Sequence, residues 1–75
     1  MSNLTPKMIA GLNLRRLIQK HYSTQEEFAY DYGIELRTVS RYINNGISKV
    51  DAVQELAEYF SVDFLDFFRE DWDLT

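Results

Sequence analysis

Two arginines, Arg37 and Arg41, stand four residues apart in a segment that also carries Thr38, Ser40 and Asn44. Residues four apart share one face of an α-helix, so a short helix would present both guanidinium groups to the same partner. Each guanidinium can donate two hydrogen bonds to O6 and N7 of a guanine. The same arginine pair also suits an ordinary solvated helix face, and the pair alone leaves both interpretations open.

Side chains suited to catalysis or metal binding are scarce in the sequence. The chain has no cysteine and one histidine, His21, so it offers no thiolate and a single imidazole. It has no glycine-rich phosphate loop, and its C-terminal acids lack the spacing of a calcium loop. We therefore expect no enzymatic activity, no metal and no cofactor. His21 is expected at a helix C-terminus, where an imidazole suits the helix dipole.

The charge of the chain is uneven along its length. The 75 residues hold 8 Lys and Arg against 12 Asp and Glu, a net charge of −4, which argues against nonspecific binding to polyanions. Residues 1–50 carry seven of the basic side chains and four acids, whereas residues 51–75 carry one basic side chain and eight acids. A polyanion is therefore expected to approach the N-terminal part, which contains both arginines.

Length and hydropathy indicate one small domain over residues 1–75. Apolar residues make up 45% and aromatic residues 15%, which is too hydrophobic for a disordered chain. No apolar run approaches the length of about 18 residues that a membrane span needs, and the N-terminus lacks a leader pattern. We expect a cytoplasmic protein without a membrane or small-molecule partner.

Helices are the only elements that the sequence signals strongly. Thr5-Pro6 is typical of a helix start, and apolar residues at helical spacing continue this helix to about His21. Thr24 and Glu27 form a capping box for a second helix, which ends at Gly33.

Three further helices are expected after Gly33. The third runs over residues 36–44, the fourth begins at a weaker capping box of Ser48 and Asp51, and Ser61 caps the fifth. The predicted fold class is all-α with five helices joined by short turns.

The spacing of Ala29, Gly33 and Val39 suits two short helices that cross at a steep angle. Ala29 allows close approach, Gly33 permits a positive φ in the turn, and Val39 packs between the helices. Together with Gln25-Glu26-Glu27-Phe28-Ala29, this spacing resembles the helix-turn-helix of the lambda-repressor and Cro type, the XRE-like family. The resemblance covers residues 7–68, and residues 69–75 form a short acidic tail.

The resemblance implies a sequence-specific double-stranded DNA-binding protein that regulates transcription, most simply a repressor that occludes a promoter. It implies that the helix over residues 36–44 lies in the major groove of an operator. The DNA-binding candidates share this helix or the start of the preceding one: Gln25, Leu36, Arg37, Thr38, Ser40, Arg41 and Asn44.

Two positions depart from the family pattern. Where members commonly carry an Arg and a Glu that pair in a buried salt bridge, this chain has Ile18 and Ile43, and we expect the two isoleucines to touch in the core. Glu35 stands where a small capping residue is usual, and it brings an acid close to the expected DNA surface.

The C-terminal segment is rich in aromatic residues. Phe60, Phe64 and Leu65 are expected in the core, whereas an exposed apolar patch is expected to form a homodimer interface. The residues of that interface are Phe67, Phe68 and Trp72. The alternative function is a protein-interaction module, antitoxin-like or antirepressor-like, that uses this acidic aromatic segment.

Overall fold

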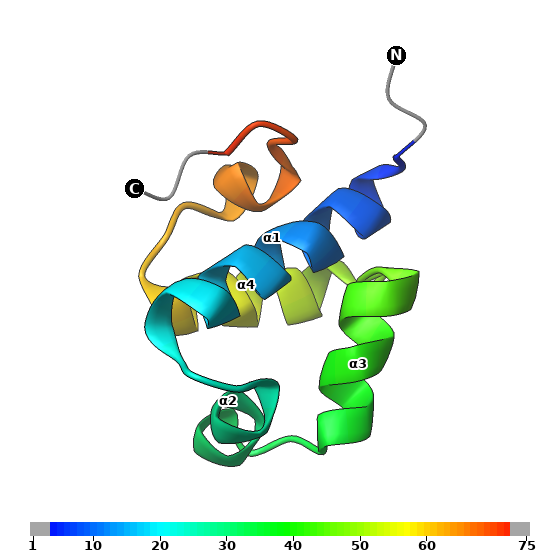
Figure 1. The fold of residues 1–75 in the computed structure, drawn as a ribbon. Helices are drawn as coiled ribbons and strands as arrows, with labels where there is room; N and C mark the ends of the chain where they lie inside the picture. Colours follow the sequence, from blue (N-terminus) through cyan, green and yellow to red (C-terminus); the bar gives the residue numbers. More distant parts are fainter. Residues whose placement is uncertain (1–3, 73–75) are drawn as a thin grey trace.

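The computed structural model describes residues 4–72, which form four α-helices and a short 3₁₀ helix with no strand among them (Figure 1). The elements are α1 (Pro6–His21), α2 (Gln25–Tyr32), α3 (Leu36–Asn45), α4 (Val50–Phe60) and η1 (Phe64–Phe68). The radius of gyration is 11.4 Å, and a compact chain of this length is expected at about 11 Å. The all-helical class is confirmed, but the fifth element is a 3₁₀ turn instead of an α-helix.

The first two helices begin where local chemistry predicts. Thr5 is the extended residue before α1 and Pro6 is its first residue, although the Thr5 side chain makes no capping hydrogen bond. At α2, Oγ1 of Thr24 accepts from the N–H of Glu27 at 3.1 Å, and Oε1 of Glu27 accepts from the N–H of Thr24 at 3.0 Å. The predicted capping box is therefore present in full.

Two predicted caps are wrong. No side chain caps α4, which follows Lys49, so Ser48 and Asp51 form no box. Ser61 ends α4 in a left-handed conformation (φ 58°). The cap of η1 is Asp63, whose Oδ1 accepts from the N–H of Leu65 at 2.9 Å. The N–H of Ser61 donates to the carbonyl oxygens of Ala57 and Glu58 at the end of α4. Ser61 therefore belongs to the end of α4, and η1 begins only at Phe64.

Helix α1 lies at the centre of the molecule and packs against α2, α3, α4 and η1. The core lies between these elements, and its apolar members are at most 5% exposed. They are Ala10, Leu14, Leu17, Ile18, Phe28, Ala29, Val39, Ile47, Val53, Leu56, Ala57 and Phe67. None of the helices within residues 4–72 is both long and apolar enough to span a bilayer.

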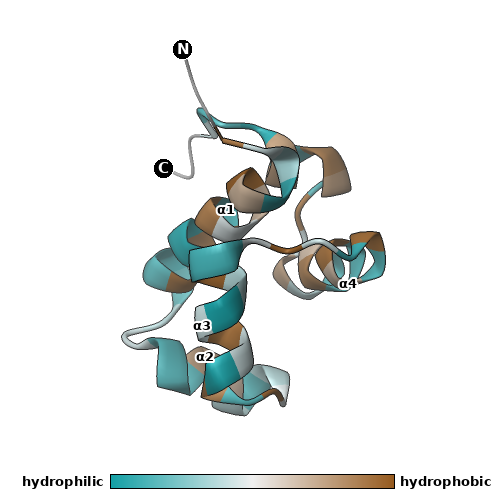
Figure 2. Ribbon diagram, turned by 90° about the vertical axis from the view of Figure 1, so that its right-hand side faces the viewer, coloured by the Kyte–Doolittle hydropathy of each residue, from teal (hydrophilic) through white to brown (hydrophobic). Residues whose placement is uncertain are grey.

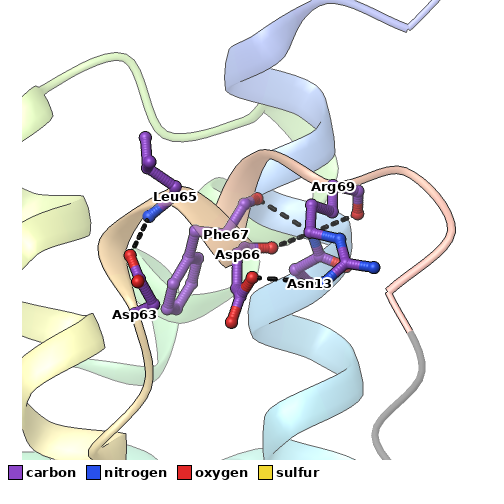
Figure 3. A network of polar contacts seen from close by, with 6 residues as sticks. All are labelled: Asn13, Asp63, Leu65, Asp66, Phe67 and Arg69. Carbon is purple, nitrogen blue, oxygen red and sulfur yellow. Dashed lines mark hydrogen bonds and ion pairs between the residues drawn. The ribbon is translucent and has the colours of Figure 1, made fainter.

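Asn13 joins α1 to the C-terminal segment (Figure 3). Its side chain is fully buried, and its Nδ2 donates to the carbonyl oxygens of Phe67 at 2.8 Å and Arg69 at 2.9 Å. Its Oδ1 accepts from Nη1 of Arg16 at 2.9 Å, and the same Nη1 also donates to the carbonyl oxygen of Glu70 at 3.0 Å. One polar side chain thus satisfies the carbonyls that η1 leaves open at its end.

The 3₁₀ geometry of η1 changes which aromatic side chains are buried. With three residues per turn, residues three apart share a face, so Phe64 and Phe67 point toward the core side. Phe67 is fully buried, whereas Leu65 is 69% exposed. The prediction that Leu65 lies in the core is therefore wrong, while Phe60 and Phe64 are half-buried and pack against the core.

Candidate nucleic-acid interface

The exposed face of α3 carries three of the polar candidates. At 3.6 residues per turn, Arg37, Arg41 and Asn44 lie within about 60° of one another around the helix, and all three are exposed. Val39 faces the opposite way and is fully buried. Figure 2, in which α3 lies in front, shows hydrophilic residues along this helix. We call Arg37, Arg41 and Asn44 the α3 stripe.

The other candidates flank the α3 stripe. Thr38 and Ser40 are half-buried neighbours of it on α3. Leu36 opens the helix and is 40% exposed, so it offers apolar contact only. Gln25 is half-buried and is the first residue of α2, where the capping box of Thr24 fixes the backbone.

Close backbone contact with α1 fixes the position of α3. A Cβ on Gly11 would overlap the carbonyl oxygen of Tyr42 and lie 3.3 Å from Cα of Gly46. A Cβ on Gly46 would lie 2.8 Å from the carbonyl oxygen of Lys7, and that oxygen accepts from the N–H of Ile47 at 2.9 Å. Two glycines thus let the end of α3 lie directly on the first turns of α1.

The turn between α2 and α3 orients the start of α3. Gly33 adopts φ 88°, and a Cβ there would meet nothing within 4 Å, so this position needs glycine for its conformation. The N–H groups of Gly33 and Ile34 both donate to the carbonyl oxygen of Ala29, at 2.9 and 3.0 Å. Ala29 and Val39 are both buried. The predicted burial of this pair and the predicted positive φ are confirmed.

Arg37 has an acidic neighbour. Its Nη2 lies 3.7 Å from Oε2 of Glu35, and the two side chains are 81% and 75% exposed. An exposed pair of this kind is worth at most about 1 kcal/mol, so Arg37 is free to leave Glu35 for a stronger acceptor. Glu35 precedes α3 and makes no capping hydrogen bond.

Arg41 shares a polar hollow of about 280 Å³ with Lys7 and Lys49. The three cations come from α3, α1 and the loop before α4, and all are exposed. In the sequence, Lys7 and Lys49 contribute only to the net charge. The fold gathers them beside the α3 stripe, because the carbonyl oxygen of Lys7 accepts a hydrogen bond from the N–H of Ile47 in the loop before α4.

The arginines of α1 lie in different surroundings. Arg15 is exposed and lines a hollow with Leu12, Ile43 and Asn44 beside α3. The side chain of Arg16 donates hydrogen bonds to Oδ1 of Asn13 and to the carbonyl oxygen of Glu70, so its role is structural. The contact expected between Ile18 and Ile43 stays a prediction; Ile18 is buried and Ile43 half-buried.

The predicted dimer surface is not continuous. Phe67 is fully buried inside the chain, so its assignment to a dimer surface is wrong. Phe68 and Trp72 are half-buried, and the Trp72 ring lies 5.8 Å from that of Phe67. The core of the same chain thus takes up much of the aromatic surface of the C-terminal segment.

His21 ends α1, as expected, and its ring stacks on Phe60 at 5.7 Å. This contact is structural. No group of three or more His, Cys, Asp or Glu side chains within residues 4–72 is placed to hold a metal ion.

A comparison with models of protein families, a search of curated proteins and a search of solved structures found no match to this chain.

Proposed function

We propose that the chain binds double-stranded DNA sequence-specifically and represses transcription by occluding a promoter. In this proposal α2 and α3 act as a helix-turn-helix of the XRE-like type, with α3 in the major groove. The observation that carries it is the α3 stripe, Arg37, Arg41 and Asn44, on a helix whose other side is fixed to α1. An α-helix fits the major groove, and arginines on it can read guanine bidentately.

Phosphate contacts complete the proposal. Lys7 and Lys49, in the hollow next to Arg41, can neutralise backbone phosphates on one side of the groove. Because the acids are concentrated beyond residue 50, DNA approaches the α3 side. The net charge of −4 makes binding depend on these few cations instead of on bulk attraction. The protein would act on DNA in the cytoplasm.

Two copies on one operator remain part of the proposal. Two half-sites about one helical turn apart would each receive an α3. The contact residues would be Phe68 and Trp72, without Phe67. Sedimentation at high micromolar concentration should show a dimer, and a monomer there would remove this part of the proposal.

The test of DNA binding is a selection from a random pool of duplexes at low salt. We expect one sequence to be enriched, and its affinity should fall steeply with added salt, by a slope of about −0.9 in log–log terms for each neutralised phosphate. A pool from which no sequence is enriched would contradict the proposal.

Glu35 provides a substitution that should strengthen binding. Glu35→Gln removes an acid that pairs with Arg37 and repels phosphate, so the affinity for the selected duplex should rise by about two- to five-fold at low salt. Glu58→Gln changes the charge equally on an exposed position of α4 and is the control. Equal effects of the two substitutions would show that only net charge matters.

A further inference from the structure

Another hollow lies away from the α3 stripe. It measures about 390 Å³ and is lined by His21, Tyr22, Asp31, Tyr59 and Phe60. These residues come from the end of α1 and the residue after it, the end of α2 and the end of α4. Figure 1 shows the ends of α1 and α4 on the left and α3 on the right. We call it the Tyr22–Tyr59 hollow.

Four of its five lining residues carry a ring. The hydroxyl groups of Tyr22 and Tyr59 are hydrogen-bonded at 2.7 Å, and the Tyr59 and Phe60 rings lie 5.2 Å apart at 90°. Tyr59 remains 42% exposed, although its ring also contacts the rings of Phe28 and Tyr32. The hollow therefore contains the partly exposed side chain of Tyr59, and the face of an aromatic ring attracts cations.

The charge around this aromatic wall is negative. The hydrogen bond with Tyr59, then burial, raises the pKa of Tyr22, and the charge of Asp31 adds to this effect. Burial raises the pKa of Tyr32, and Glu55 and Glu58 on α4 add to it. Tyr22 and Tyr32 therefore stay neutral at physiological pH, while Asp31 contributes a carboxylate to the lining of the hollow. An anionic partner is disfavoured there.

We propose that the Tyr22–Tyr59 hollow binds an arginine side chain of a partner protein. The guanidinium group would stack on the exposed ring of Tyr59 and donate to the carboxylate of Asp31. A planar guanidinium suits both contacts at once, because it stacks on aromatic rings and pairs with carboxylates through two parallel hydrogen bonds. The size of the hollow suits one extended side chain, and the carboxylate of Asp31, the one acid in its lining, complements that charge.

This site is separate from the DNA surface. The lining of the hollow contains no residue of α3, so the partner can be held while α3 is on DNA. The inference does not depend on the proposed DNA binding: arginine binding and duplex selection can each fail alone.

The experiment is a nuclear magnetic resonance titration of the full chain with three short peptides. Glycine flanks a central arginine, citrulline or lysine. The arginine peptide should shift the signals of the hollow residues, whereas citrulline, a neutral analogue of similar shape, should not. Lysine should bind more weakly than arginine, because an ammonium group does not stack.

Two variants test the carboxylate. Asp31→Asn should weaken binding of the arginine peptide by about five-fold, the value of one exposed ion pair. It should not harm the fold, since Asp31 is exposed near the C-terminal end of α2, where an acid is unfavourable. Glu26→Gln makes the same charge change on the same helix, 140° away around its axis by the helical period, and is the control.

Three results would overturn the inference. They are equal shifts with arginine and citrulline, equal weakening by Asp31→Asn and Glu26→Gln, or shifts confined to α3. If the lysine peptide binds as tightly as the arginine peptide, the proposal that the hollow prefers arginine is wrong. Asp31→Asn should leave the affinity for a selected duplex unchanged, which separates this site from the DNA-binding face.

Discussion

Gly11→Ala is expected to lower the free energy of unfolding by about 3 kcal/mol. The new Cβ would overlap the carbonyl oxygen of Tyr42, which already accepts from the N–H of Gly46 at 2.9 Å. The obstacle is backbone, so α3 must move away from α1 to make room. Denaturant melts followed by circular dichroism measure the loss.

The sign of this effect distinguishes packing from helix propensity. In a solvated helix, replacing glycine with alanine stabilises by about 1 kcal/mol. Gln19→Ala, at an exposed position of the same helix, is the matched control and should change the stability by less than about 0.5 kcal/mol. A Gly11→Ala chain as stable as the native one would contradict the close α1–α3 contact.

Asn13→Ala is expected to cost about 2–4 kcal/mol of stability. It leaves the carbonyl oxygens of Phe67 and Arg69 without their donor, and each unsatisfied buried group costs about 1–3 kcal/mol. The single tryptophan, Trp72, lies 5.8 Å from Phe67, so its fluorescence should report loosening of the C-terminal segment in the same melts.

Asn13→Asp isolates the donor role. Aspartate has the shape of asparagine, but its ionised side chain has no N–H to donate. At this position it would turn an oxygen toward two carbonyl oxygens. It should be at least as destabilising as Asn13→Ala at neutral pH, even though Arg16 stays beside the other oxygen. Native-like stability of Asn13→Asp would show that the donated hydrogen bonds carry little weight.

Much of the helical framework is predictable because its signals are local. The capping box of Thr24 and Glu27 needs only residues three apart, and Gly33 is needed for its own φ of 88°. The exposed α3 stripe follows from the helical period alone. These features depend on neighbours along the chain, which the sequence displays directly.

The features that the sequence does not predict depend on contacts between distant segments. Asn13 looks like a surface residue, but its partners lie more than 50 positions away. The need for glycine at Gly11 arises only when α3 crosses it. Leu65 and Phe67 exchange their expected places because η1 has three residues per turn, a difference that an apolar stripe does not reveal.

The most direct test of the central proposal, that α3 reads DNA, is the affinity of Arg41→Ala for the selected duplex. Arg69→Ala is the control, because it removes the same charge from an exposed arginine on the far, C-terminal segment, where it pairs with Asp66 at 3.3 Å. We expect Arg41→Ala to weaken binding by about ten-fold or more and to relax the preference at one base pair, and Arg69→Ala to change it by less than about two-fold. Equal effects of the two substitutions, or an unchanged base preference, would contradict the reading of DNA by α3.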